Sequence, residues 1–168
     1  MNALLVMPIL IPLTTLILCL LVKRRHAWVA LISMTGAVLL LLTGIWLVVL
    51  ASQGVVLSGQ MGGWDAPYGI SLVIDRLSAV MVAITGIIGL ATLVYVHRQP
   101  MPADFLRDNN LFVQGLLTGI CGAFVTADIF NLYVWFEVLL IGSFALISLG
   151  GGVRRLAGAM TYLVLNQQ

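Results

Sequence analysis

Long apolar runs separated by short polar segments dominate the sequence. Five such runs hold 17 to 25 residues each, and they cover residues 3–22, 27–50, 72–96, 111–127 and 130–149. A helix of about twenty residues rises about 30 Å, which matches the hydrocarbon core of a bilayer. The pattern therefore predicts an all-α polytopic membrane protein with five transmembrane helices.

A sixth apolar stretch is shorter than the others. It covers residues 156–165 and is followed by Asn166, Gln167 and Gln168. Its helix would rise about 15 Å, roughly half of what a span needs. We expect an incomplete sixth helix, with the chain stopping inside the membrane as a truncated product. A short re-entrant or interfacial tail is the alternative.

The connection between the second and third runs is rich in turn-forming and aromatic residues. They are Gly59, Gly62, Gly63, Trp64, Pro67, Tyr68 and Gly69. Glycine and proline favour turns, and aromatic side chains suit the headgroup layer of a bilayer. This connection is expected to lie at a membrane surface.

Composition excludes several classes of protein. Apolar residues make up 61% of the 168 residues, charged residues make up 8%, and the net charge is +2. A soluble domain carries about a quarter charged residues, and a nucleic-acid binder needs clustered basic ones. Cys19 and Cys121 lie inside apolar runs without metal-ligand spacing. We expect no nucleic-acid partner, no metal, no cofactor and no enzyme activity of the chain itself.

The basic residues predict the orientation. The connections 23–26, 97–108 and 150–155 fall on one side of a five-span protein and hold seven of the eight Lys and Arg residues. Basic loops face the cytoplasm, so the N-terminus is expected outside. The remaining Arg76 lies next to Asp75 at the outer side, where either a local ion pair or snorkelling of its side chain to the surface is expected.

Glu137 is the main candidate for chemistry. It lies within the run 130–149 and has no charged residue within seven positions on either side. An ionised carboxylate at such depth costs about 2.5 to 3.5 kcal/mol on insertion scales, so it must bind a proton or face a cation. Tyr133 and Ser148 share its helix face and are candidates for a proton path. The alternative is a neutral Glu137 that only supports helix packing.

The fourth run carries small residues at every fourth position, which favours close helix packing. They are Gly115, Gly119, Ala123 and Ala127. Gln114 and Thr118 in the same run are candidates either for the path or for hydrogen bonds that support packing. Asp128 is expected to cap the helix that begins near Phe130.

Two strings of residues resemble a known family. FVTADIFNLYVWFEVLLIGSFALI, at 124–147, and GGWDAPYGISLVIDRLS, at 62–78, resemble the D-type subunits of the multisubunit Mrp-type sodium/proton antiporters. That family is related to the proton-pumping membrane subunits of respiratory complex I and of membrane-bound hydrogenases.

The resemblance implies a longer antiporter-like fold of two inverted repeats after three leading helices. Residues 1–110 would supply the three leading helices, and residues 111–168 would begin the first repeat and stop early. The resemblance also implies that a lysine two helices further on, beyond this chain, pairs with Glu137.

Three hypotheses follow. The first is a subunit of a Na⁺ or K⁺/proton antiporter in the bacterial inner membrane, working with other subunits and inactive as this fragment alone. The second is a pumping subunit of an NADH:quinone oxidoreductase or a membrane-bound hydrogenase. The third is a truncated remnant that does not transport, because the partners of Glu137 are missing.

Overall fold

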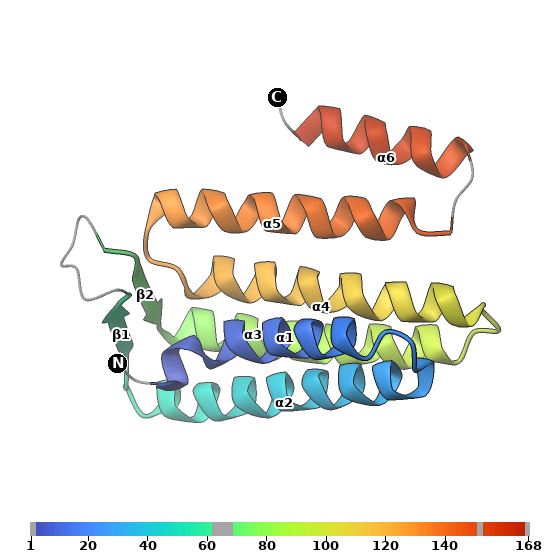
Figure 1. Cartoon of the computed structure of the whole chain (residues 1–168). Coiled ribbons are helices and arrows are strands. Elements are labelled where there is room, and N and C mark those ends of the chain that lie inside the picture. Colours follow the sequence, from blue (N-terminus) through green and yellow to red (C-terminus); the bar gives the residue numbers. More distant parts are fainter. Residues whose placement is uncertain (1–2, 62–68, 151–152, 167–168) are drawn as a thin grey trace.

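The computed structural model describes residues 3–61, 69–150 and 153–166. Helices and strands follow in the order α1 (Ala3–Leu21), α2 (His26–Ser52), β1 (Leu57–Gln60), β2 (Ser71–Ile74), α3 (Arg76–His97), α4 (Ala103–Val125), α5 (Ile129–Ser148) and α6 (Val153–Asn166). The helices lie side by side along one common direction, with the strands at one end (Figure 1).

Four of the described helices, α1, α2, α3 and α5, are long and apolar enough to cross a membrane. Helix α4 has 23 residues and begins before the predicted run at Leu111, with Asp104 and Arg107 in its first turns. It is therefore long enough to span but more polar than its neighbours. Helix α6 has 14 residues, fewer than a span requires. The chain is a multi-pass helical membrane protein.

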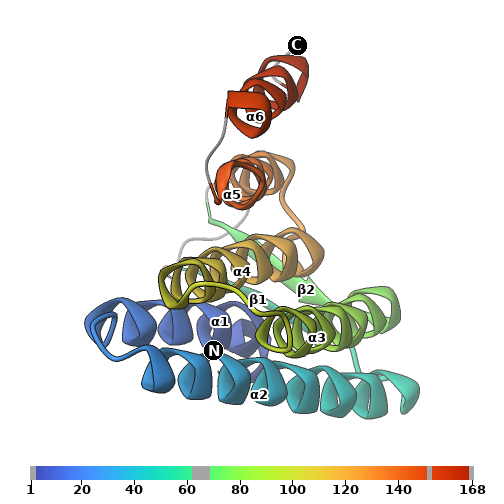
Figure 2. The same ribbon diagram turned by 90° about the vertical axis from the view of Figure 1, so that its right-hand side faces the viewer.

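The first four helices form one packed group. Helix α2 packs along α3, α1 packs against α2 and α4, and α3 packs against α4. Their shared core includes the fully buried side chains of Leu5, Leu40, Leu47, Val82 and Leu93. Helix α5 lies on the other side of α4, and α6 lies beyond α5, so these two form successive outer layers (Figure 2).

Two glycines allow α2 and α3 to approach closely. A Cβ atom added at Gly44 would lie 2.6 Å from the Cα atom of Ala83, and one at Gly86 would lie 2.7 Å from the Cα atom of Leu41. These contacts are with backbone, which cannot move aside as a flexible side chain can. The α2–α3 contact therefore depends on the missing side chains at both positions.

A hairpin of two antiparallel strands corrects the predicted start of the third helix. Leu72, the predicted first residue of that helix, lies in β2, and α3 begins at Arg76. Leu57 pairs with Ile74, and Gly59 pairs with Leu72. The side chains of Leu72 and Ile74 are both buried, which is the alternation of a strand with one face on the core. The apolar run thus contains a strand followed by a helix.

Asp75 caps α3 and does not form the expected ion pair with Arg76. The Asp75 carboxylate accepts a hydrogen bond of 2.8 Å from the Ser78 backbone N–H. That bond favours the charged carboxylate and lowers the pKa of Asp75. Arg76 donates from Nε to the carbonyl oxygen of Ala51, at the end of α2. The helix N-terminus offers the carboxylate a better partner than the neighbouring guanidinium does.

The two ends of the bundle differ in their connections. The α1–α2, α3–α4 and α5–α6 connections lie at one end, and the hairpin and the α4–α5 turn lie at the other (Figure 1). The first group contains the connections that the basic residues predict to face the cytoplasm. Of the turn-rich connection, residues 62–68, with Trp64, Pro67 and Tyr68, lie outside the described residues, as do Gln167 and Gln168.

The substitution Gly86→Ala tests the close α2–α3 contact. We expect it to destabilise the protein by about 1–3 kcal/mol, because the new methyl group overlaps the backbone at Leu41. Denaturant unfolding in detergent measures the change. Gly158→Ala in α6, where a Cβ would meet no atom within 4 Å, is the control. Equal stability of the two variants would contradict the packing described for α2 and α3.

Candidate functional site

The turn between α4 and α5 fixes the start of the helix that carries Glu137. As predicted, Asp128 caps α5, and its carboxylate accepts a hydrogen bond of 2.9 Å from the Phe130 backbone N–H. Asn131 is buried and donates from Nδ2 to the Thr126 hydroxyl at 2.8 Å. The Ala127 backbone N–H donates to the Ser71 carbonyl oxygen in β2. The first turn of α5 is therefore tied to α4 and to the hairpin.

Helix α5 packs against α4 with one face. The indole ring of Trp135 lies directly against Gly122 of α4, where a side chain would overlap it. A Cβ at Gly119 would lie 3.2 Å from Leu139, and a Cβ at Gly142 would lie 3.4 Å from the Leu116 backbone. These contacts fix which side of α5 faces α4.

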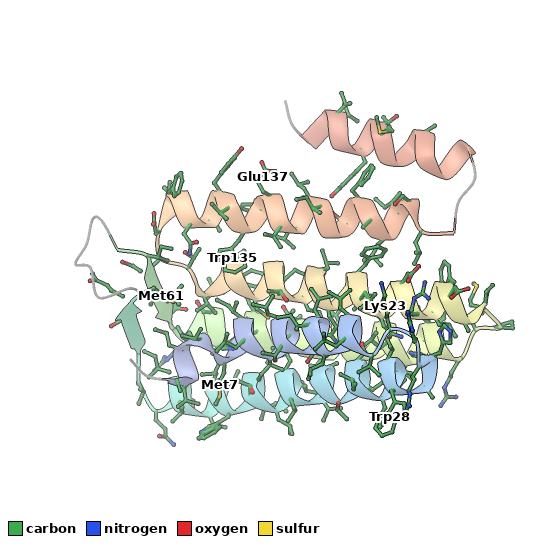
Figure 3. The ribbon with its side chains drawn as sticks, in the orientation of Figure 1. Met7, Lys23, Trp28, Met61, Trp135 and Glu137 are labelled. Atoms are coloured by element: carbon green, nitrogen blue, oxygen red, sulfur yellow. The ribbon has the colours of Figure 1, made fainter. Side chains whose placement is uncertain are left out.

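Glu137 lies on the opposite side of α5. Its side chain points away from α4, toward the side on which α6 lies, whereas Trp135 points toward α4 (Figure 3). Glu137 is half-buried, and the side chains exposed around it on α5 are mostly apolar. They include Phe130, Tyr133, Phe136 and Ile141, each more than half exposed. The described helices therefore leave much of this face of α5 exposed.

Of the two path candidates on the same helix as Glu137, Tyr133 lies beside it and Ser148 does not. Tyr133 lies one turn before Glu137 on the same helix, and the two side chains are close enough to interact. Ser148 lies eleven residues further, about 16 Å along the axis, and its hydroxyl donates to the Ala145 carbonyl oxygen. Ser143, which sequence reasoning missed, contacts the Tyr162 hydroxyl of α6 at 3.2 Å.

Gln114 and Thr118 face the interior of the first four helices. Gln114 is fully buried and donates from Nε2 to the carbonyl oxygen of Ser33 in α2 at 2.9 Å and to its hydroxyl at 3.1 Å. Its Oε1 atom is buried without a hydrogen-bond partner. The Thr118 hydroxyl donates to the Gln114 carbonyl oxygen. These two polar groups lie on the α2 side of α4, away from Glu137.

The small residues of the fourth run have different surroundings. Gly119 contacts α5 closely, whereas a Cβ at Gly115 would lie 3.9 Å from the Cδ2 atom of Leu16. Ala123 is half-buried in α4, and Ala127 lies beyond the end of the helix at Val125. Ala127 therefore cannot continue the packing stripe. The sequence analysis missed Gly122. A large side chain such as Trp135 on the next helix can pack closely only against a residue without a side chain, and that was the available signal.

A second polar cluster, also missed by sequence reasoning, lies at the other end of the bundle. The His97 Nε2 atom lies 3.2 Å from Asn110 Oδ1, and Asn110 is almost fully buried. A hollow of about 210 Å³ beside this pair is lined by His26 and Arg107, among others. Arg107 is paired with Asp104 and Asp108. The cluster joins α3 to α4. The polar residues at the start of α4 were the feature of the sequence that could have indicated it.

The described residues contain no group of three His, Cys, Asp or Glu side chains that could hold a metal ion. Cys19 and Cys121 are buried and free. The candidate site therefore consists of one carboxylate, Glu137, with the Tyr133 hydroxyl beside it, on a helix face that the described helices leave open.

The chain is similar to curated antiporter subunits, although no protein-family profile matches it. It is 36% identical over 170 residues to the D-type subunit of the Na⁺/H⁺ antiporter of Bacillus subtilis and 37% identical over 169 residues to that of Alkalihalophilus pseudofirmus. It is also 34% identical to the D-type subunit of a probable K⁺/H⁺ antiporter of Rhizobium meliloti. Each match covers 99% of this chain and between 32% and 34% of the relative.

Solved structures share the fold. The chain matches the Mrp complex of a Dietzia species with a TM-score of 0.86, and the archaeal membrane-bound sulfane sulfur reductase with a TM-score of 0.88, both at 23% identity. These matches cover 99% and 97% of this chain, and 32% and 34% of the matched chains.

The chain thus spans about a third of the length of the curated relatives it matches. Nearly every residue of it takes part in those matches, and they confirm the resemblance seen in the residues around Glu137. Over nearly its whole length the chain is therefore similar to the D-type subunits of Na⁺/H⁺ antiporters, and it shares the fold of a chain of the Mrp complex.

Proposed function

We propose that the chain is part of a membrane subunit of a monovalent cation/proton antiporter and that Glu137 carries the transported proton. The single observation that supports this most strongly is the position of Glu137, half-buried in an apolar helix long enough to span the membrane. The relatives named as antiporter subunits supply the class of activity. No other acidic residue lies within α5.

The physical basis is the cost of a charge at membrane depth. An ionised carboxylate in a helix centre is unfavourable by about 2.5 to 3.5 kcal/mol on insertion scales unless a cation or hydrogen bonds compensate it. The Tyr133 hydroxyl, one turn away on the same helix, would supply one hydrogen bond. Proton binding or the approach of a cation supplies the rest, and alternation between these two states moves a proton.

In this proposal, the positive charge that neutralises the Glu137 carboxylate comes from a basic side chain on another helix. The face of α5 around Glu137 exposes Phe130, Tyr133 and Ile141, and α5 packs against only α4 and α6 to any extent among the described elements. The curated relatives are about three times as long as this chain. A further helix with a basic side chain would cover this apolar face and pair with Glu137, so the 168 residues alone would not transport.

The transported cation and the orientation are parts of the same proposal. The relatives include sodium and potassium antiporter subunits, so either Na⁺ or K⁺ would move against the proton. The basic connections at one end of the bundle favour that end as cytoplasmic and the N-terminus as external, in a bacterial inner membrane. Other subunits of a multisubunit complex would be its partners.

A second candidate is a pumping subunit of a redox-driven membrane complex. The similarity in fold to a chain of the sulfane sulfur reductase, an archaeal respiratory membrane complex, supports this second candidate. The same carboxylate chemistry would then be driven by electron transfer in other subunits. Antiport in vesicles without any electron donor would distinguish the first candidate from the second.

The substitution Glu137→Gln tests the proposed proton site. We expect it to abolish cation/proton antiport by the full-length protein in its complex, because glutamine keeps the shape but cannot bind and release a proton. Collapse of a proton gradient on addition of Na⁺ or K⁺ to membrane vesicles measures the activity. Asp128→Asn is the matched control, because asparagine also caps a helix. Full antiport by the Glu137→Gln variant would refute the assignment.

The substitution Gln114→Ala distinguishes a structural role of Gln114 from a role in the proton path. We propose that Gln114 joins α4 to α2, so its loss should destabilise the protein by about 1–3 kcal/mol by leaving Ser33 without its partner. Unfolding in detergent measures the stability, and vesicle antiport is scored per amount of folded complex. Loss of antiport as complete as with Glu137→Gln, at equal amounts of folded complex, would instead place Gln114 on the proton path.

A further inference from the structure

An apolar groove runs between α1 and α5 across the surface of α4. Figure 2 shows α1 and α5 on different sides of α4, which forms the floor between them. The groove has a volume of about 300 Å³, and its walls include Leu16, Leu20, Phe112, Ile141 and Ala145. Gly115 and Gly142 also line it, so the floor and one wall lack side chains where these glycines lie.

The groove leads to a basic turn. A second hollow of about 310 Å³ is lined by residues 20–25, so Leu20 belongs to both hollows. Lys23, Arg24 and Arg25 form the turn after α1, and all three are exposed. Figure 3 shows Lys23 at this end of α1. The ion pairs among the described residues involve Arg107 and leave these three side chains unpaired.

We propose that the groove binds an acyl chain of a phospholipid whose anionic headgroup lies against Lys23, Arg24 and Arg25. The apolar walls suit a hydrocarbon chain, and the unpaired basic side chains attract a headgroup with net negative charge. Phosphatidylglycerol has both parts. Ile141, in one wall of the groove, lies one turn from Glu137 on α5, but Glu137 itself does not line the groove, and the lipid site does not depend on the proposed transport.

The basic turn at the end of the groove favours a lipid over a partner helix. The residues that line the groove are apolar, and the charged side chains that line the adjoining hollow are Lys23, Arg24 and Arg25. A lipid with an anionic headgroup complements both parts. An acyl chain is also narrower than a helix and flexible, so it can follow the groove to the basic turn.

Native mass spectrometry of the full-length protein in its complex tests the proposal. The purified complex is titrated with phosphatidylglycerol or with phosphatidylcholine in detergent, and bound lipid is counted. We expect phosphatidylglycerol to bind more tightly. Replacing Lys23, Arg24 and Arg25 together with Gln should weaken it by roughly 100-fold, because each basic residue contributes roughly fivefold near a membrane surface. Gly115→Leu should block the groove and weaken binding of both lipids.

Two controls keep the result specific. The exchange Lys23→Arg, Arg24→Lys and Arg25→Lys keeps the charge and should keep the binding, as should Arg98→Gln, which removes an exposed charge from another turn at the same end. Gly115→Leu adds a test that does not change the charge pattern that sets orientation. Equal binding of the two lipids, or binding that none of the variants weakens, would overturn the proposal.

A photo-crosslinking amino acid at Phe112 identifies the occupant directly. Phe112 lines the groove on α4. A crosslinked phospholipid is the expected product in intact membranes. A crosslink to another protein subunit would show a protein occupant and overturn the proposal, as would displacement of phosphatidylglycerol by millimolar inorganic phosphate, which would show a phosphate site without a lipid requirement.

Discussion

The arrangement around α5 depends on one constraint, which is that a carboxylate at membrane depth must be neutralised. Glu137 lies near the middle of an apolar helix, with the Tyr133 side chain one turn away on the same helix. The same helix is fixed on its other face by the contact of Trp135 with Gly122. Because that contact orients α5, it also determines that Glu137 faces away from the first four helices.

The fold separates a rigid part from an open part. Helices α1 to α4 share a core and are joined by the Gln114–Ser33 hydrogen bonds and by the close approach of Gly44 and Gly86 to the facing backbones. The hairpin links this core to the α4–α5 turn through Ser71 and Leu72. Helix α5 then presents Glu137 on a surface where Phe130, Tyr133 and Phe136 are more than half exposed.

Much of this was predictable from the sequence, for physical reasons. The apolar runs predict the long helices because a membrane requires about twenty apolar residues per span, and Asp128 was correctly predicted as a cap. The strand at 71–74 was missed because a short apolar strand and a buried helix have the same hydropathy. The sides faced by Gln114 and Glu137 could not be predicted, since helix packing depends on partners such as Gly122 that lie elsewhere in the sequence.

The most direct measurement is carbodiimide modification of Glu137 in the assembled complex, because a hydrophobic carbodiimide reacts with protonated carboxyl groups in apolar surroundings. Peptide mass spectrometry locates the modified residue. If Glu137 exchanges a proton for a countercharge, it will be modified, the modification will decrease as the pH rises, and antiport will be lost in proportion to it. A Glu137 that stays unmodified at every pH, or whose modification leaves antiport intact, would contradict its role as the proton carrier.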